Sequence, residues 1–202
     1  DQDVAPVASR VAGCVDPCRG EAFRLLEFAS SEAILNARQH SGGAGFVSAQ
    51  YAPKKELARI GVADCGIGIR ASFQRNESPF YKKGMTELDA LLLALKPEVS
   101  STTHLRTAYG SSPNKGVGLS MMLNLMSQSL GYMCLISGEA WWYKEGQDQA
   151  KYGVFRNGKR FEGTICAIAF QRGQIDNYFE MLERARNELK LKSDKPVGNI
   201  FI

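Results

Sequence analysis

Hydrophobic residues recur at helical spacing along the stretch from residue 21 to residue 41. A period near 3.6 residues is typical of an amphipathic helix that buries one face. The run Ser41-Gly42-Gly43 follows it, and glycines are common where a helix ends. The pattern therefore predicts one long helix whose apolar stripe consists of Phe23, Leu26, Ala33 and Ala37.

Alternating apolar and polar positions predict β-strands in two parts of the chain. The first part covers 46–51 and 56–63, which are separated by a Pro-Lys-Lys turn and form a hairpin. The second part covers 132–136, 139–144, 152–155 and 161–170. Because Asn-Gly is a strong turn signal, Asn157-Gly158 predicts a second hairpin between the last two strands.

Three further helices are predicted. In the first, Thr86 is a candidate N-cap with Asp89 three residues later, and a leucine stripe follows until Lys96-Pro97. The second covers about 116–130. The third begins near Asp176, with an apolar face that either caps the core or contacts a partner: Ile175, Phe179, Leu182, Ala185 and Leu189.

The remaining segments divide the chain into one domain with two appendages. Residues 1–19 are rich in small residues and broken by Pro6, Gly13 and Pro17, which predicts an N-terminal entry arm or the stump of an upstream segment. Residues 20–172 form the domain, and 173–202 are a C-terminal helix and tail. Within the domain, 70–114 is mostly polar and predicts a flexible insert with one short helix.

These elements predict an α+β fold, a two-layer α/β sandwich with a mixed, mostly antiparallel sheet. The predicted helices at 21–41, 116–130 and 86–96 would cover one face of the sheet. The other face would be partly solvated or covered by the terminal helix. Hairpin turns join nearly all the strands, which argues against a doubly wound parallel sheet.

Composition narrows the possible functions. The 202 residues are 44% hydrophobic and 23% charged, which is enough for one good core. A net charge of +4 without a basic block does not indicate nucleic-acid binding. We expect no membrane span in this segment and no leader. The odd count of 5 cysteines favours reduced thiols and a cytoplasmic location.

The long helix carries a polar row that suggests chemistry. Glu32, Asn36 and His40 are each four residues apart and therefore share one face. A carboxylate can accept a proton, and a carboxamide oxygen can ligate a hard cation. Taken alone, the same row is also what a solvated helix face would show.

Two glycine stretches suggest ligand contacts. Asp64-x-Gly66-x-Gly68-Ile69 directly follows a predicted strand, where glycines let a backbone approach a ligand and an aspartate can accept from an amine. As a dinucleotide fingerprint it fails, because a helix and a third glycine are missing. A strand-to-loop turn is the alternative interpretation.

The second stretch, Lys115-Gly116-Val117-Gly118-Leu119, opens a predicted helix. Free amides and the positive end of a helix suit phosphate oxygens. The lysine precedes the glycines, so the stretch is not a Walker loop. A simple glycine-rich helix cap explains it equally well.

The order of these motifs, with Gly163-Thr164 in the last strand, resembles the Bergerat-fold ATPase superfamily over about 21–170. That superfamily includes sensor histidine kinases, DNA gyrase, large heat-shock chaperones, mismatch-repair ATPases and anti-sigma serine kinases. The resemblance implies an ATP site with Mg²⁺, and a nucleotide lid formed by 70–114.

The resemblance also implies a role for each matching residue. Asn36 would ligate Mg²⁺, and Glu32 would orient or deprotonate the attacking group. Asp64 would accept from the adenine amine with help from Thr164. The nucleotide would further contact Gly66, Gly68, Ile69, Lys115, Gly116, Gly118 and Leu119.

Three functions remain open at this point. The first is a regulatory protein kinase of the anti-sigma type, with a phosphoacceptor or sigma-type factor as its partner. The second is the catalytic domain of a sensor histidine kinase. The third is a nucleotide-gated binding module with little turnover, and a homodimer is compatible with any of them.

Overall fold

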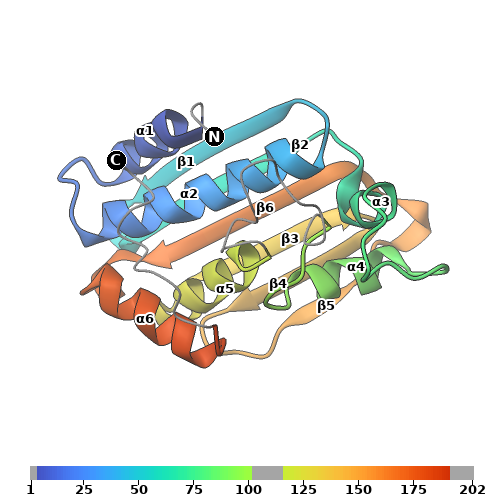
Figure 1. Ribbon diagram of the computed structural model, residues 1–202. Helices are drawn as coiled ribbons and strands as arrows, with labels where there is room; N and C mark the ends of the chain where they lie inside the picture. Colours follow the sequence, from blue (N-terminus) through green and yellow to red (C-terminus); the bar gives the residue numbers. More distant parts are fainter. Residues whose placement is uncertain (1–3, 102–115, 192–202) are drawn as a thin grey trace, which may run out of the picture.

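The computed structural model describes residues 4–101 and 116–191 and shows a layer of helices on one face of a six-stranded sheet (Figure 1). The strand order across the sheet is β1-β2-β6-β3-β4-β5. The strands are β1 (Gly45–Ala52), β2 (Leu57–Asp64), β3 (Tyr132–Gly138), β4 (Ala140–Glu145), β5 (Lys151–Val154) and β6 (Phe161–Gln171). The predicted two-layer α+β class is confirmed.

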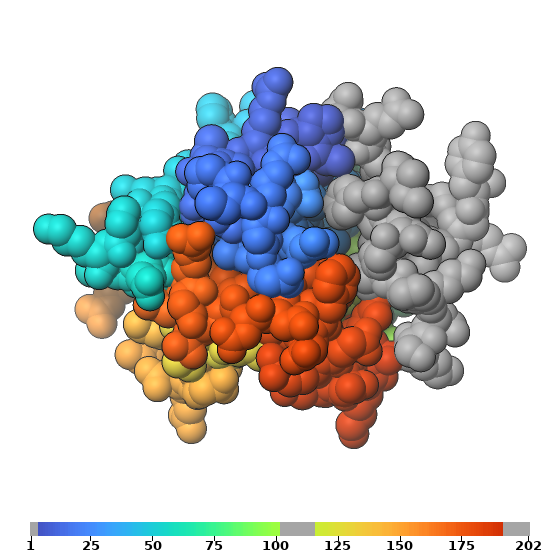
Figure 2. Space-filling model, turned by 90° about the vertical axis from the view of Figure 1, so that its left-hand side faces the viewer, coloured from blue at the N-terminus to red at the C-terminus, as the bar shows by residue number. Residues whose placement is uncertain are grey.

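The helices are α1 (Val4–Val15), α2 (Glu21–His40), α3 (Gly68–Arg75), α4 (Glu87–Ala94), α5 (Gly118–Gln128) and α6 (Tyr178–Glu188). Helix α2 lies across β1 and β2, and α5 lies across β3 and β6 (Figure 1). Figure 2 shows α1 and α2 in blue above α6 in red, with the cyan turn between β1 and β2 beside them.

Every strand pairing in the described chain is antiparallel, so the sheet is not mixed. The hairpin predicted from 46–63 is present as β1 and β2. The hairpin predicted between 152–155 and 161–170 is wrong, because β5 pairs with β4 whereas β6 lies between β2 and β3. The long, apolar β6 has neighbours on both edges, and the four-residue β5 is left at the edge of the sheet.

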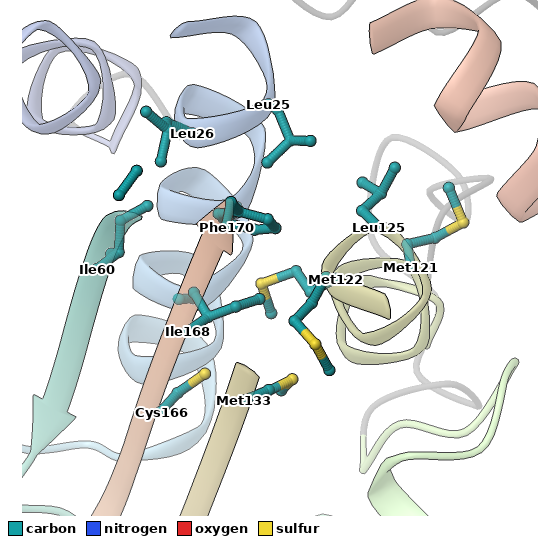
Figure 3. Close-up of a cluster of buried hydrophobic side chains, with 14 of the residues drawn as sticks. Leu25, Leu26, Ile60, Met121, Met122, Leu125, Met133, Cys166, Ile168 and Phe170 are labelled. Atoms are coloured by element: carbon teal, nitrogen blue, oxygen red, sulfur yellow. The ribbon is translucent and has the colours of Figure 1, made fainter. Parts of the chain in front are cut away.

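The core lies between the sheet and helices α2 and α5. Alternate residues of β2 and β6 point toward the helices, as a sheet with one covered face requires. In Figure 3 side chains from α2, α5, β2, β3 and β6 meet in one apolar cluster: Leu25, Leu26, Ile60, Met121, Met122, Leu125, Met133, Cys166, Ile168 and Phe170. Burying a side chain of this size contributes about 1.5–3 kcal/mol.

The segment predicted as an N-terminal arm contains a helix that the sequence patterns did not predict, because Val4–Val15 is α1. Pro6 falls in the first turn, where backbone N–H groups have no intrahelical partner and a proline is tolerated. Ala8 and Ala12 are fully buried, so small side chains let α1 pack closely onto α2. The arm is part of the fold.

The insert contains more regular structure than predicted. Helix α3 begins at Gly68, where no helix was expected, and α4 follows with the predicted Thr86–Asp89 capping box. Phe73 of α3 packs with Ala90 and Ala94 of α4 in a second apolar cluster. The rest of the predicted lid, from residue 102 to residue 114, lies outside the described residues.

Helix α6 lies on the same face of the sheet as α2 and α5, not on the opposite face. Tyr178, Met181, Leu182 and Ala185 are buried, whereas Phe179 is 47% exposed. The buried face is therefore rotated from the predicted one. Leu182 and Leu189 pack on the main core, so this helix caps the core.

Within the described residues, no helix is both long and apolar enough to cross a membrane. All five cysteines are free thiols.

Candidate functional site

The carboxylate of Glu32 lies directly against Gly118, the first residue of α5. A β-carbon added at Gly118 would collide with the Oε2 atom of Glu32, so a larger residue there would force this carboxylate to move. Burial raises the pKa of Glu32 to about 7. Nothing in the described chain offsets that burial, because no hydrogen bond or positive charge contributes to the shift. A carboxylate with this pKa can accept and release a proton near neutral pH.

Asn36 lies one turn further along α2, on the face of Glu32. Its Nδ2 atom is buried and has no hydrogen-bond partner in the described part of the chain. An unpaired buried polar group costs about 1–3 kcal/mol, and such groups are rare in native proteins. The carboxamide of Asn36 therefore has unused capacity for a ligand.

Asp64 ends β2 and is only 4% exposed. Its carboxylate accepts the backbone N–H of Gly66 at 2.9 Å and that of Thr164, which lies opposite on β6. Burial raises the pKa of Asp64, and these two hydrogen bonds partly oppose the rise. A carboxylate has about four lone-pair sites, so Asp64 retains acceptor capacity for one more donor.

The loop after Asp64 packs tightly on the C-terminal end of α2. A β-carbon at Gly66 would collide with Ser41, and one at Gly43 would lie 2.6 Å from the carbonyl oxygen of Cys65. The N–H of Ile67 donates to the carbonyl of Ser41 at 3.2 Å. Contact within the protein is therefore sufficient to explain Gly66.

Gly68 has a φ of +75° and begins α3 beside the ends of β3 and β6. Ser137 is fully buried, accepts the N–H of Ile69 at 2.8 Å and donates to the carbonyl of Gly163 at 3.3 Å. The sequence patterns did not indicate a role for Ser137. The available signal was a serine in an apolar strand directly before a glycine.

The second glycine stretch is only partly described. Lys115 lies outside the described residues. Gly116 has a φ of +82°, and a β-carbon there would lie 2.8 Å from the backbone of Glu98 and Val99. The side chains of Leu119 and Ile69 both pack against the two apolar clusters.

A polar cluster joins the end of α2 to α3 and to the segment after α4. The Nδ1 atom of His40 lies 3.0 Å from the Oγ of Ser101, and Ser101 Oγ lies 2.9 Å from that of Ser72. Asn76 donates to Ser101 at 3.1 Å. Burial, aided by the nearby positive charge of Arg75, lowers the pKa of His40.

Helix α2 thus organises two groups of predicted residues. Glu32 contacts the start of α5 and Asn36 lies one turn further along the same helix face, whereas the loop from Asp64 to Gly68 contacts the end of the helix. Glu32 and Ser41 are nine positions apart, or about 13 Å along a helix axis. The two groups can therefore contact different parts of one elongated ligand.

The donor set fits Mg²⁺ in a complex with phosphates, but not alone. In the described chain, no group of three or more His, Cys, Asp or Glu residues could hold a metal ion. Mg²⁺ commonly takes one or two protein ligands together with phosphate oxygens and water. The carboxamide oxygen of Asn36 is one candidate ligand of that kind, whereas its unpaired Nδ2 is a donor that suits a phosphate oxygen and not a metal.

No family model matches this chain, and a search of curated proteins found no similar sequence. The fold and the geometry of the site therefore carry the functional argument.

Proposed function

We propose that this chain is an ATP-binding domain of the Bergerat type that catalyses magnesium-dependent phosphoryl transfer. The observation that supports this most strongly is Glu32. Glu32 is partly buried, its carboxylate has a pKa near 7, and it lies against the first residue of α5. Helix N-termini favour phosphate oxygens, so a base there would lie beside a bound phosphate chain.

ATP would supply the phosphoryl group, and Mg²⁺ would neutralise part of its phosphate charge. The carboxamide oxygen of Asn36 would hold the metal, its Nδ2 would be free to donate to a phosphate oxygen, and Glu32 would accept the proton of the attacking hydroxyl or water. At a pKa near 7, Glu32 is ionised often enough to accept a proton and basic enough to drive the transfer.

Asp64 would bind the adenine amine. Its carboxylate is fixed by two backbone N–H donors, which orient it before any ligand arrives. Thr164 lies directly opposite Asp64, and its side chain would assist from there. A buried acceptor of this kind favours a ligand that carries an N–H donor at the same place.

The phosphoacceptor that we propose is a regulatory protein, as in the anti-sigma serine kinases. The poised Glu32 favours a domain with turnover over a binding module. We also propose a cytoplasmic location, which the five free thiols support.

Calorimetry with ADP or ATP, each with and without Mg²⁺, tests the binding half of the proposal. Incubation with γ-labelled ATP, alone and with a cell extract, tests the chemistry by following the label to this chain, to another protein or to water. Absence of nucleotide binding would reject the proposal. Binding without transfer or hydrolysis would leave a nucleotide-gated module.

A further inference from the structure

The face of the sheet that the helices leave open carries an ordered set of side chains. This face points away from the viewer in Figure 1. The strand registers align its residues in three transverse rows. The first row crosses all six strands and is entirely apolar: Phe46, Ala63, Ile165, Ile136, Trp141 and Gly153.

The apolar row remains accessible to solvent. Phe46 is 62% exposed, and none of the other five residues is buried. No member of the row belongs to either apolar cluster of the described core. Sheets that face water usually carry polar residues at such positions, so a continuous apolar row indicates a contact surface.

The other two rows become progressively more polar. The second contains Ser48, Gly61, Ala167, Cys134, Tyr143 and Lys151. The third contains Gln50, Arg59, Ala169, Tyr132 and Glu145. Arg59 on β2 and Glu145 on β4 lie on opposite sides of the two central strands.

We propose that the open face binds a second copy of this chain in a two-fold symmetric sheet-on-sheet dimer. A two-fold axis parallel to the central strands places β1 over β5, β2 over β4 and β6 over β3 of the second copy. It also places each row over its own equivalent. Aligned sheet packing keeps the strand directions within about 30°.

Side-chain volumes on this face are complementary under that axis. Ala63 lies over Trp141 of the second copy, and Gly61 lies over Tyr143, so large residues meet small ones. Phe46 lies over Gly153, beside which the Trp141 ring of the same subunit packs, so Phe46 would meet this ring across the interface. Alternation of large and small residues is how two sheet faces interdigitate.

Charges are complementary under the same axis. Arg59 lies over Glu145 of the second copy, and the symmetry repeats this ion pair. The Nε of Arg59 is buried and has no hydrogen-bond partner in the described chain, although its Nη1 donates to Gln50 at 3.1 Å. Within one subunit the two strands are three steps apart, about 14 Å, which is too far for an ion pair.

The size of the face suits a stable dimer. Six strands span about 24 Å, and an eight-residue strand is about 27 Å long, which gives a face of roughly 650 Å². Standard interfaces bury about 800 Å² per partner, a similar area.

Charge-reversal variants test the proposal, with the oligomeric state measured by sedimentation velocity at high micromolar concentration. The wild-type chain should be a dimer, and Arg59→Glu or Glu145→Arg alone should weaken it at least ~100-fold, because each creates two like-charge contacts. A mixture of the two variants should dimerise again, since every contact then pairs opposite charges. Lys54→Glu, an equivalent charge change at an exposed turn, should leave the dimer unchanged.

Three outcomes would overturn the proposal. They are a wild-type monomer at high micromolar concentration, a dimer that neither variant weakens, and two monomeric variants that do not associate when mixed. Phe46→Glu gives a second measurement, because this exposed side chain contributes little to the fold of the monomer and should still weaken the dimer. The result is independent of whether the chain binds a nucleotide.

Discussion

The two groups of residues along α2 differ in how their polar atoms are satisfied. Around Asp64, the polar groups are paired: Asp64 accepts from Gly66, and Ser137 joins Ile69 to Gly163. Around Glu32, burial is not compensated. No hydrogen bond or positive charge of the described chain offsets the burial of Glu32, and the Nδ2 of Asn36 has no partner there either.

This difference suggests separate roles: Asp64 is held in a fixed orientation, and Glu32 is able to exchange a proton. A carboxylate held by backbone N–H groups is fixed in place and has limited freedom to change its protonation state. A carboxylate buried without partners has a raised pKa and can exchange a proton near neutral pH. We therefore expect substitutions near Asp64 to act on affinity and substitutions of Glu32 to act on turnover.

The largest expected effect is on turnover. Glu32→Ala should reduce phosphoryl transfer or hydrolysis by roughly 10²–10⁴-fold, the usual contribution of general base catalysis. Affinity for magnesium-ATP should stay within a few-fold, because the base acts on the attacking oxygen only as the transition state forms. The wild-type rate should rise with pH through about 7, as Glu32 ionises.

Glu27→Ala, on the same helix, is the matched control for this measurement. It removes a similar carboxylate away from Gly118 and should leave the rate unchanged. Equal losses in both variants would mean that Glu32 has no special role.

The next largest effect should be on ADP affinity. Asp64→Asn replaces an acceptor oxygen by a donor, which would face the proposed adenine amine. We expect a loss of about 2–3 kcal/mol in calorimetry, because a buried donor is left unpaired. Unchanged affinity would show that Asp64 does not contact the base.

Asp64→Asn also disturbs a carboxylate that accepts two backbone hydrogen bonds, so its effect on protein stability must be separated from its effect on ADP binding. Asp16→Asn provides the comparison. Asp16 is equally buried and accepts the N–H of Phe23 at 3.1 Å and Arg172 at 3.0 Å, far from the candidate site. It should lower stability and leave ADP affinity unchanged.

A third effect concerns stability against pH. The pKa of Glu32 is raised from 4.5 to about 7, so ionisation in the folded state opposes folding. The wild-type chain therefore loses stability as pH rises from about 4.5 to 7, and the loss is complete above 7. Glu32→Gln should remove it and stabilise the chain at pH 8 by about 1–3 kcal/mol.

Urea unfolding of both chains at pH 4 and pH 8 measures this difference. Glu32→Gln and wild type should have similar free energies of unfolding at pH 4, where Glu32 is protonated in both states. An equal difference at the two pH values would show that the carboxylate does not titrate as the structure indicates.

Periodicity in the sequence predicted most of the fold. The α2 stripe and the Thr86–Asp89 capping box are local patterns, and local geometry alone determines them. The position of β6 is different, because an Asn-Gly turn specifies a reversal but not which strands then pair. The partners of β6 are determined by the burial of its apolar side chains against elements far away in the sequence.

The candidate site was predictable in its residue types and not in its contacts. The spacing of Glu32 and Asn36 on one helix face follows from sequence. That Gly118 makes room for Glu32, and that Gly66 makes room for Ser41, depends on elements far apart in the chain. The helix at Gly68 was missed because glycine rarely begins one, and here Ser137 bonds the N–H of the next residue.

The smallest expected effect belongs to Asn36. Its carboxamide is the only group on this face of α2 that the proposal uses as a metal ligand, and phosphate oxygens and water would supply the other ligands. Asn36→Ala should weaken ATP binding about 10-fold in Mg²⁺, because the metal loses one protein oxygen ligand that water must replace. With a chelator present, both chains should bind ATP equally.

Because Asn36 has a buried Nδ2 without a partner in the described chain, its removal should not destabilise the fold, and thermal unfolding checks this directly. If the variant loses the same affinity with and without Mg²⁺, Asn36 contacts the nucleotide itself and the metal assignment is wrong.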